Sequence, residues 1–148
     1  MADDSSEFDQ IDRVILSHLA AEGRMSWTAL SEKVHLAPSS VADRVRRLER
    51  DGVIAGYRAI IDRDAIGRDV RAVVEVGLVA GADAEAFESR LRERDEVDFA
   101  AYVTGTSDYS VQVSCRGSDG LDAIVRWLRA DAAVGRTESK FILRVVVD

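Results

Sequence analysis

The apolar positions within residues 26–51 repeat with the period of an α-helix and are interrupted once. Leu30 and Val34 stand four positions apart, and Ser26 stands where the N-cap of a helix is expected. A break of three residues follows, and Pro38 then opens a second helix, where the missing N–H of proline costs nothing. The apolar stripe of this second helix comprises Val41, Val45 and Leu48. The pattern predicts two short amphipathic helices joined by a tight turn.

The polar side of the second predicted helix is rich in arginine. Four arginines stand against two acidic residues within positions 38–50, which gives this segment a local charge of +2. Such a face is often merely solvated. Three neighbouring features favour a DNA-binding unit instead: an apolar helical stripe at residues 11–19, Gly52 at the expected helix end, and a short strand over Val53–Tyr57 that would form a wing.

We therefore predict that the second helix enters the major groove. Its arginines would contact bases or phosphates, its serines would donate hydrogen bonds from the N-terminal turn, and its first acidic residue would accept from a cytosine amino group. The predicted DNA-binding residues are Ser39, Ser40, Asp43, Arg44 and Arg47.

The second half of the chain alternates strand and helix patterns. The predicted strands are 72–79, 97–103, 109–115 and 137–147, and the predicted helices are 83–94 and 118–131. Ser118 or Asp119 would cap the second of these helices. The order β-α-β-β-α-β is that of a ferredoxin-like domain, with both helices on one face of an antiparallel sheet. The uncovered face predicts a dimer formed sheet to sheet, which would also bring two recognition helices together.

The predicted class is α+β, with an N-terminal winged helix-turn-helix and a C-terminal ferredoxin-like βαββαβ ligand-sensing domain. The expected domains are residues 1–56 and 70–148, joined by a linker at 57–69 in which Ile60-Ile61 indicates a further strand.

Composition narrows the function further. The 148 residues are 47% hydrophobic and 32% charged, with a net charge of −7, so indiscriminate nucleic-acid binding is disfavoured. No apolar run is long enough to span a membrane, and no signal peptide is evident, so we expect a cytoplasmic protein. The single cysteine, Cys115, lies in an apolar strand and is expected to be a buried, inert thiol. His18 and His35 lack partners at ligand spacing, and no catalytic constellation stands out, so we expect no metal, no cofactor and no enzyme activity.

These features resemble the Lrp/AsnC ("feast/famine") family of transcription factors along nearly the whole chain. In the first half the resemblance rests on Phe8-Asp9, Ile11-Asp12, Gly23-Arg24, Arg44 with its flanking apolar positions, and the run from Gly52 to Tyr57. In the second half it rests on Val103-Thr104-Gly105 followed by Asp108-Tyr109. The resemblance implies dimers, often assembled into octamers, and small-molecule effectors, typically amino acids, bound between neighbouring subunits.

The Gly-x-x-Asp-Tyr loop, Gly105–Tyr109, is the effector site that this resemblance implies. Gly105 would let a ligand approach the backbone closely, and Asp108 would pair with an ammonium group. The alternative is a plain hairpin turn. The predicted effector-binding residues are Tyr102, Thr104, Gly105, Thr106, Asp108, Tyr109 and Ser139. The sequence departs from the family at Ala37, where a Ser or Thr cap is usual, and at Ser139, where Thr is frequent.

The function expected from the sequence is a sequence-specific transcriptional regulator of double-stranded DNA. A small molecule, typically an amino acid, would modulate its oligomeric state or its DNA affinity. Two alternatives share the fold: an architectural protein that wraps DNA without an effector, and an enzyme similar to sirohaem decarboxylases. The second is disfavoured because no histidine follows position 35.

Overall fold

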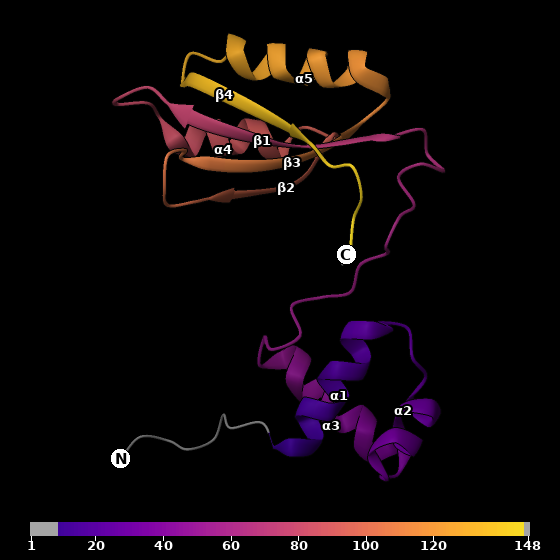
Figure 1. The fold of residues 1–148 in the computed structure, drawn as a ribbon. Coiled ribbons are helices and arrows are strands. Elements are labelled where there is room, and N and C mark those ends of the chain that lie inside the picture. Colours follow the sequence, from indigo (N-terminus) through magenta and orange to yellow (C-terminus); the bar gives the residue numbers. More distant parts are fainter. Residues whose placement is uncertain (1–8, 147–148) are drawn as a thin grey trace, which may run out of the picture. The chain divides into compact units, whose positions relative to one another are not determined.

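The computed structural model describes residues 9–146, which form two compact units divided between Ile60 and Ile61. Figure 1 shows the helices and strands of the two units, which are described one at a time below. Each unit has its own hydrophobic core. None of the helices within the described residues is both long enough and apolar enough to cross a membrane.

The first unit contains three helices around a small apolar core. These helices are α1 (Gln10–Ala21), α2 (Trp27–Val34) and α3 (Pro38–Arg50). The predicted apolar stripes meet inside this unit, where the fully buried members include Ile15, Leu30, Val41 and Val45. The third helix expected from residues 11–19 is therefore confirmed as α1.

The ends of these helices follow the local sequence. Ser26 caps α2 by accepting a hydrogen bond from the backbone N–H of Ala29 at 3.1 Å, as predicted. Ala37 stands at the N-cap of α3 and makes no side-chain capping bond. His35 ends α2 in the left-handed region, with φ 54°, and thereby makes the sharp turn between α2 and α3.

The wing strand expected at Val53–Tyr57 is not formed. After Gly52, which adopts φ 73° just beyond α3, residues 53–62 carry no strand. The backbone N–H of Ile54 bonds to the carbonyl of Leu48, and its side chain packs on the helical core. Among the described residues of this unit no strand lies beside the segment, and of its apolar side chains Ile54 packs on the core while Val53 and Tyr57 stay exposed.

The second unit is a four-stranded antiparallel sheet in the order β2-β3-β1-β4. Its strands are β1 (Val70–Leu78), β2 (Val97–Tyr102), β3 (Tyr109–Cys115) and β4 (Val134–Phe141), and its helices are α4 (Ala84–Arg92) and α5 (Gly117–Ala130). One face of β1 and β3 shares a core with both helices, where Val74, Phe87, Val111 and Leu128 are fully buried. This arrangement is the ferredoxin-like fold that the sequence predicts.

Three local expectations in this unit are wrong. Residues 57–69 form no strand; instead Arg68 donates to the carbonyl of Asp95, and the Asp69 carboxylate accepts from the N–H of Gly117 at 2.9 Å. That contact, rather than Ser118 or Asp119, satisfies the start of α5. The last strand begins at Val134 and ends at Phe141, which pairs with Ala72 of β1. Residue 147 of the predicted strand lies outside the described residues.

Candidate DNA-binding surface and effector loop

The outer face of α3 presents a polar, mostly exposed surface. Ser39, Ser40 and Asp43 are exposed, as expected for residues that meet DNA. Arg46 and Asp43 form an ion pair at 2.7 Å in which both side chains are about two-thirds or more exposed. This helix offers both donors and an acceptor without any rearrangement of its backbone.

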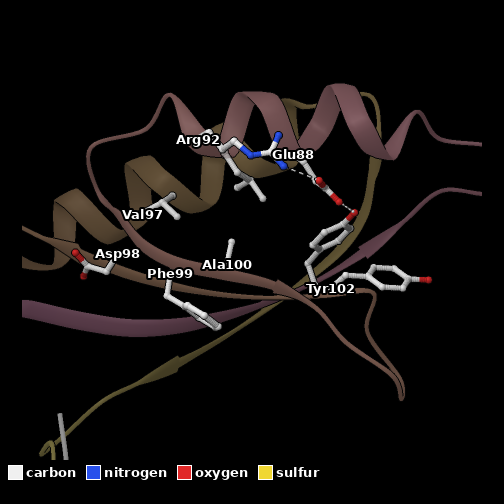
Figure 2. Close-up of a pocket in the computed structure, with 9 residues that line it drawn as sticks. Glu88, Arg92, Val97, Asp98, Phe99, Ala100 and Tyr102 are labelled. Atoms are coloured by element: carbon white, nitrogen blue, oxygen red, sulfur yellow. Dashed lines mark hydrogen bonds and ion pairs between the residues drawn. The ribbon is translucent and has the colours of Figure 1, made fainter. Parts of the chain in front are cut away.

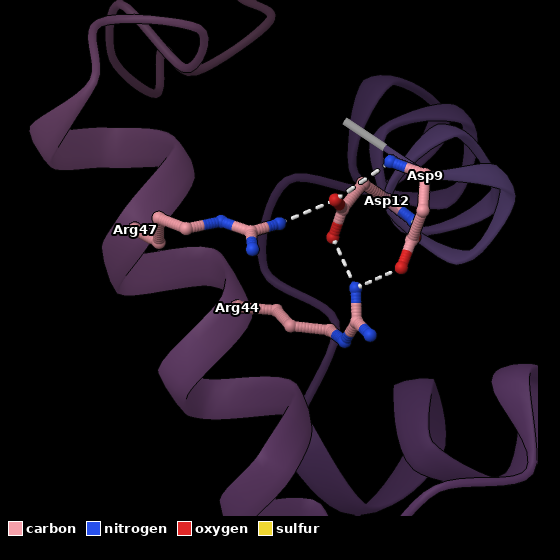
Figure 3. A network of polar contacts seen from close by, with 4 residues as sticks. All are labelled: Asp9, Asp12, Arg44 and Arg47. Carbon is pink, nitrogen blue, oxygen red and sulfur yellow. Dashed lines mark hydrogen bonds and ion pairs between the residues drawn. The ribbon is translucent and has the colours of Figure 1, made fainter. Parts of the chain in front are cut away.

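Arg44 and Arg47 point from α3 toward the start of α1, where they meet two carboxylates (Figure 3). The Nη1 of Arg44 donates to Asp9 at 2.7 Å and to Asp12 at 2.9 Å, and the Nη2 of Arg47 donates to the other oxygen of Asp12. The Asp12 side chain is completely buried. A buried carboxylate is tolerated only when it is paired and hydrogen-bonded, and here both oxygens are.

Asp9 and Asp12 also cap α1. Each carboxylate accepts from the backbone N–H of the other, at 2.9 and 3.1 Å, in a reciprocal capping box. The hydrogen bond from the Asp12 N–H, followed by that from Arg44, lowers the pKa of Asp9. The same carboxylates raise the pKa of Arg44. The sequence did not reveal this network, because its partners lie 32 and 35 positions apart.

An open hollow of about 460 Å³ lies along the outer side of α3. It is lined by Asp43, Arg44, Arg46, Arg47 and Arg50. Arg46 and Arg50 were not among the predicted contacts, although the spacing of arginines along the helix would have included them. The hollow is suited to an anion, because four guanidinium groups border it.

The predicted effector loop connects β2 to β3 and is fixed at two points. The N–H of Asp108 donates to the carbonyl of Val76 at 2.9 Å, and its carboxylate accepts from the N–H of Leu78 at 2.7 Å. On the other side, Arg136 of β4 donates to the carbonyl of Thr106. Gly105 adopts φ 128°, which a residue with a side chain rarely does, and Thr104, Gly105 and Thr106 are exposed.

Two other predicted effector residues line a separate cavity of about 350 Å³ between α4 and β2 (Figure 2). Tyr102 is 71% exposed, and its ring contacts the buried ring of Tyr109 edge to face at 5.3 Å. The Tyr109 hydroxyl donates to Glu88 at 2.9 Å, and Glu88 pairs with Arg92 at 2.8 Å. Burial, and then the contact with Glu88, raises the pKa of Tyr109 to about 12.

Ser139 is exposed on β4, where it pairs with Val74, and it lines neither the cavity nor the fixed ends of the loop. The sequence analysis missed Arg136, Glu88 and Arg92, which surround the two predicted regions. Their positions follow from strand order and helix placement, which the local sequence does not encode.

No cluster of three or more potential metal-ligating side chains occurs among residues 9–146. Cys115 is buried, at 3% exposure, and burial raises the pKa of its thiol. A thiol of this kind is a poor nucleophile.

The chain combines a helix-turn-helix unit with a sheet domain whose β2–β3 loop is held by Asp108 and Arg136. This combination is typical of DNA-binding regulators that carry a ligand-binding domain. Residues 8–55 match the family model of winged helix-turn-helix DNA-binding domains. Residues 71–148 match the model of the Lrp/AsnC ligand-binding domain. The chain belongs to the Lrp/AsnC family of transcriptional regulators.

Relatives support this assignment over nearly the whole chain. The transcriptional regulator AldR of Mycobacterium tuberculosis is 35% identical over 93% of this chain and 78% of its own length. The regulator LrpA of the same organism is 34% identical, over 91% and 89%.

Solved structures share the fold. A transcriptional regulator of Neisseria meningitidis in complex with L-methionine has a TM-score of 0.91 at 27% identity, covering 96% of this chain and 94% of that one. The feast or famine regulatory protein of M. tuberculosis complexed with L-methionine has a TM-score of 0.88 at 32% identity, with 96% of each chain covered.

Proposed function

We propose that this protein is a sequence-specific regulator whose DNA affinity or assembly responds to a small molecule, an amino acid being the class supported best. The observation that carries the DNA-binding part is α3, which follows a tight turn and presents an exposed polar face with arginines along one side. Two structural neighbours are complexes with L-methionine, which supports the ligand class.

The direct DNA contacts that we propose are Ser39, Ser40, Asp43 and Arg47. The serines stand in the first turn of α3, where exposed N–H groups and hydroxyls can reach phosphate or base edges. Arg44, a DNA contact in the sequence-based prediction, receives another role here. Its guanidinium binds Asp9 and Asp12 and so ties α3 to α1.

The effector site that we propose is the loop at Thr104–Asp108 together with the neighbouring cavity. The exposed turn at Gly105 suits a ligand carboxylate, because backbone N–H groups bind anions where no side chain intervenes. The cavity has the mixed character of an amino-acid site: an apolar wall that includes Leu91, and the charged groups Glu88 and Arg92 at its rim.

A homodimer, and from it a higher oligomer such as an octamer, is the assembly that we propose. Several large apolar side chains remain exposed in a single chain: Ile60 81%, Phe99 55%, Phe141 58% and Leu143 97%. Large exposed apolar side chains on the sheet domain, such as Phe99 and Phe141, are typical of surfaces that associate. The two helix-turn-helix units of a dimer would meet DNA half-sites about one helical turn apart.

The test is binding of the purified protein to the DNA upstream of its own gene. The duplex competes with random DNA at two salt concentrations, with and without a mixture of amino acids. Preferential binding that one amino acid shifts supports the full proposal. Binding that random DNA competes away equally favours the architectural alternative, and no binding even at low salt contradicts a DNA-binding role. Absorbance on adding sirohaem then tests the enzyme alternative.

The effector site has its own test in Tyr102→Ala. This side chain is exposed, so its removal is tolerated by the core. We expect the ratio of DNA affinities with and without the active amino acid to fall toward one. An unchanged ratio in a folded variant contradicts the assignment of the cavity.

A further inference from the structure

The buried carboxylate of Asp12 lies at the centre of the contact between α1 and α3. One of its oxygens accepts from Arg44, and the other accepts from Arg47 and from the N–H of Asp9 (Figure 3). A buried charge does not stabilise a fold better than a well-packed apolar group of the same size. Besides capping α1, Asp12 binds two arginines of α3, and this second contact points to a role beyond stability.

The two arginines that Asp12 binds differ in their exposure and in the N–H donors that remain for another partner. Arg44 is 26% exposed and shares one nitrogen between two carboxylates. Arg47 is 44% exposed and has a single bond among the described residues, from Nη2 to Asp12. A guanidinium has five N–H donors in a planar fork, so the one bond to Asp12 leaves Arg47 four donors for another partner.

Arg47 also borders the hollow along α3. Arg46 and Arg50, which are 68% and 72% exposed, border the same hollow. Their present partners, Asp43 and Asp51, are exposed as well, so an incoming anion can replace them at little cost. The contact between Arg47 and Asp12 is different, because the Asp12 side chain is completely buried.

We infer that this hollow binds a phosphate of the DNA backbone, and that Asp12 is the positioning residue that fixes Arg47 toward it. Asp12 holds one edge of the guanidinium, and the phosphate takes the other edge. Fixing a long side chain in advance lowers the entropy lost on binding. The inference rests on the proposed DNA-binding function and adds to it a site that reads no sequence.

The decisive variant is Asp12→Asn, because simple electrostatics and this inference predict opposite results. If only total charge mattered, the loss of an acidic group near α3 would strengthen DNA binding. We expect weaker binding instead, by roughly tenfold, which corresponds to one charged hydrogen bond. The loss is expected to be equal for operator and random duplexes. The slope of log K against log salt should shrink by about one per helix, although no basic residue was removed.

The matched control is Glu22→Gln, which removes one exposed acidic group at the other end of α1. It changes the net charge by the same amount and leaves Arg47 in place, so we expect binding no weaker than that of the original protein. Fluorescence anisotropy with a labelled duplex measures all these affinities, and circular dichroism reports whether each variant is folded.

A second pair of variants tests the inference even if Asp12→Asn fails to fold. Arg47→Lys keeps the charge, but an ammonium group cannot hold a carboxylate and a phosphate at opposite edges. Arg46→Lys keeps the charge at an exposed position that needs no such fork. We expect Arg47→Lys to weaken binding to both duplexes by roughly tenfold and Arg46→Lys by much less.

Equal affinities for these two lysine variants, or an Asp12→Asn protein that binds DNA as tightly as the original with the same salt slope, would overturn the inference. The proposed function fails separately, if the original protein shows no preference for its upstream DNA. The comparison on random duplex still tests the phosphate site in that case.

Discussion

Replacing Arg44 by methionine isolates the contact between α1 and α3. The substitution keeps most of the aliphatic stem and removes the guanidinium, so Asp12 loses one of its two arginine partners. Removing a partner from a buried ion pair costs about 3–5 kcal/mol. Asp12 retains Arg47, so we expect less, about 2–3 kcal/mol, the value of a single hydrogen bond to a charged group.

The assay uses the distribution of the two tryptophans, Trp27 in α2 and Trp127 in α5. In a Trp127→Phe background the fluorescence reports unfolding of the first unit alone. For a unit of this size the loss corresponds to roughly 10–20 °C in melting temperature. Arg46→Met is the matched control: it deletes an exposed ion pair on the same helix, and we expect a change within about 0.5 kcal/mol.

The comparison decides between two roles for Arg44. If Arg44 only reads DNA, Arg44→Met and Arg46→Met will have the same unfolding free energy in the absence of DNA, and the structural reasoning is refuted. If Arg44 ties the helices together, the variant is less stable. In addition, its remaining folded fraction keeps the preference of the original protein for operator over random DNA.

Three further measurements test other parts of the structure. Ala37→Ser supplies the missing cap of α3, and urea unfolding should show a gain of about 1 kcal/mol. The pKa of Tyr109, about 12, lies above its unfolded value near 10, so the stability from its neutral form is complete below pH 10. It is lost as pH rises toward 12, and Tyr109→Phe should flatten the stability profile in that window. Burial alone would raise the pKa of Asp131, but hydrogen bonds from Arg90 and from the Ala133 N–H lower it overall. Its contribution to stability is therefore present above its unfolded pKa, near 4, and lost as pH falls through the lower folded value. Asp131→Asn should remove that acid dependence, with Trp127 fluorescence as the probe.

The sequence predicts correctly those elements whose formation depends only on residues close to one another in the chain. The stripe of Val41, Val45 and Leu48 becomes the buried side of α3, because helical periodicity alone decides which side chains share a face. The alternation in β3 holds in the same way: Tyr109, Val111 and Val113 are buried beneath the helices. The cap at Ser26 needs only its own third neighbour.

The predictions were wrong for elements that depend on partners far away in the sequence. Val53–Tyr57 and Ile60-Ile61 have the composition of strands, but a strand also needs a neighbour to bond, and neither has one among the described residues. The start of α5 is satisfied by Asp69, which lies 48 positions upstream of Gly117. No local pattern contains that information.

The candidate site shows the same difference between features set by neighbouring residues and features set by distant partners. The exposure of Ser39 and Ser40 follows from helical phase, and the turn at Gly105 follows from residue type. The direction in which each arginine side chain points cannot be predicted in this way, because it depends on where a carboxylate lies in the folded unit. Arg136, which holds the effector loop, reaches it from a strand some 30 positions away.

The pairing of the arginines on α3 explains how an acidic chain can carry a DNA-binding helix. Each of them has a carboxylate partner: Arg44 with Asp9 and Asp12, Arg46 with Asp43, Arg47 with Asp12, and Arg50 with Asp51. Four positive and four negative groups leave this surface close to neutral. Attraction to random DNA is then small, because non-specific binding depends on uncompensated cations. Phosphates can displace the exposed partners Asp9, Asp43 and Asp51, whereas Asp12 is completely buried. Contacts with base edges then contribute a larger share of the total affinity, which is the balance that a regulator requires.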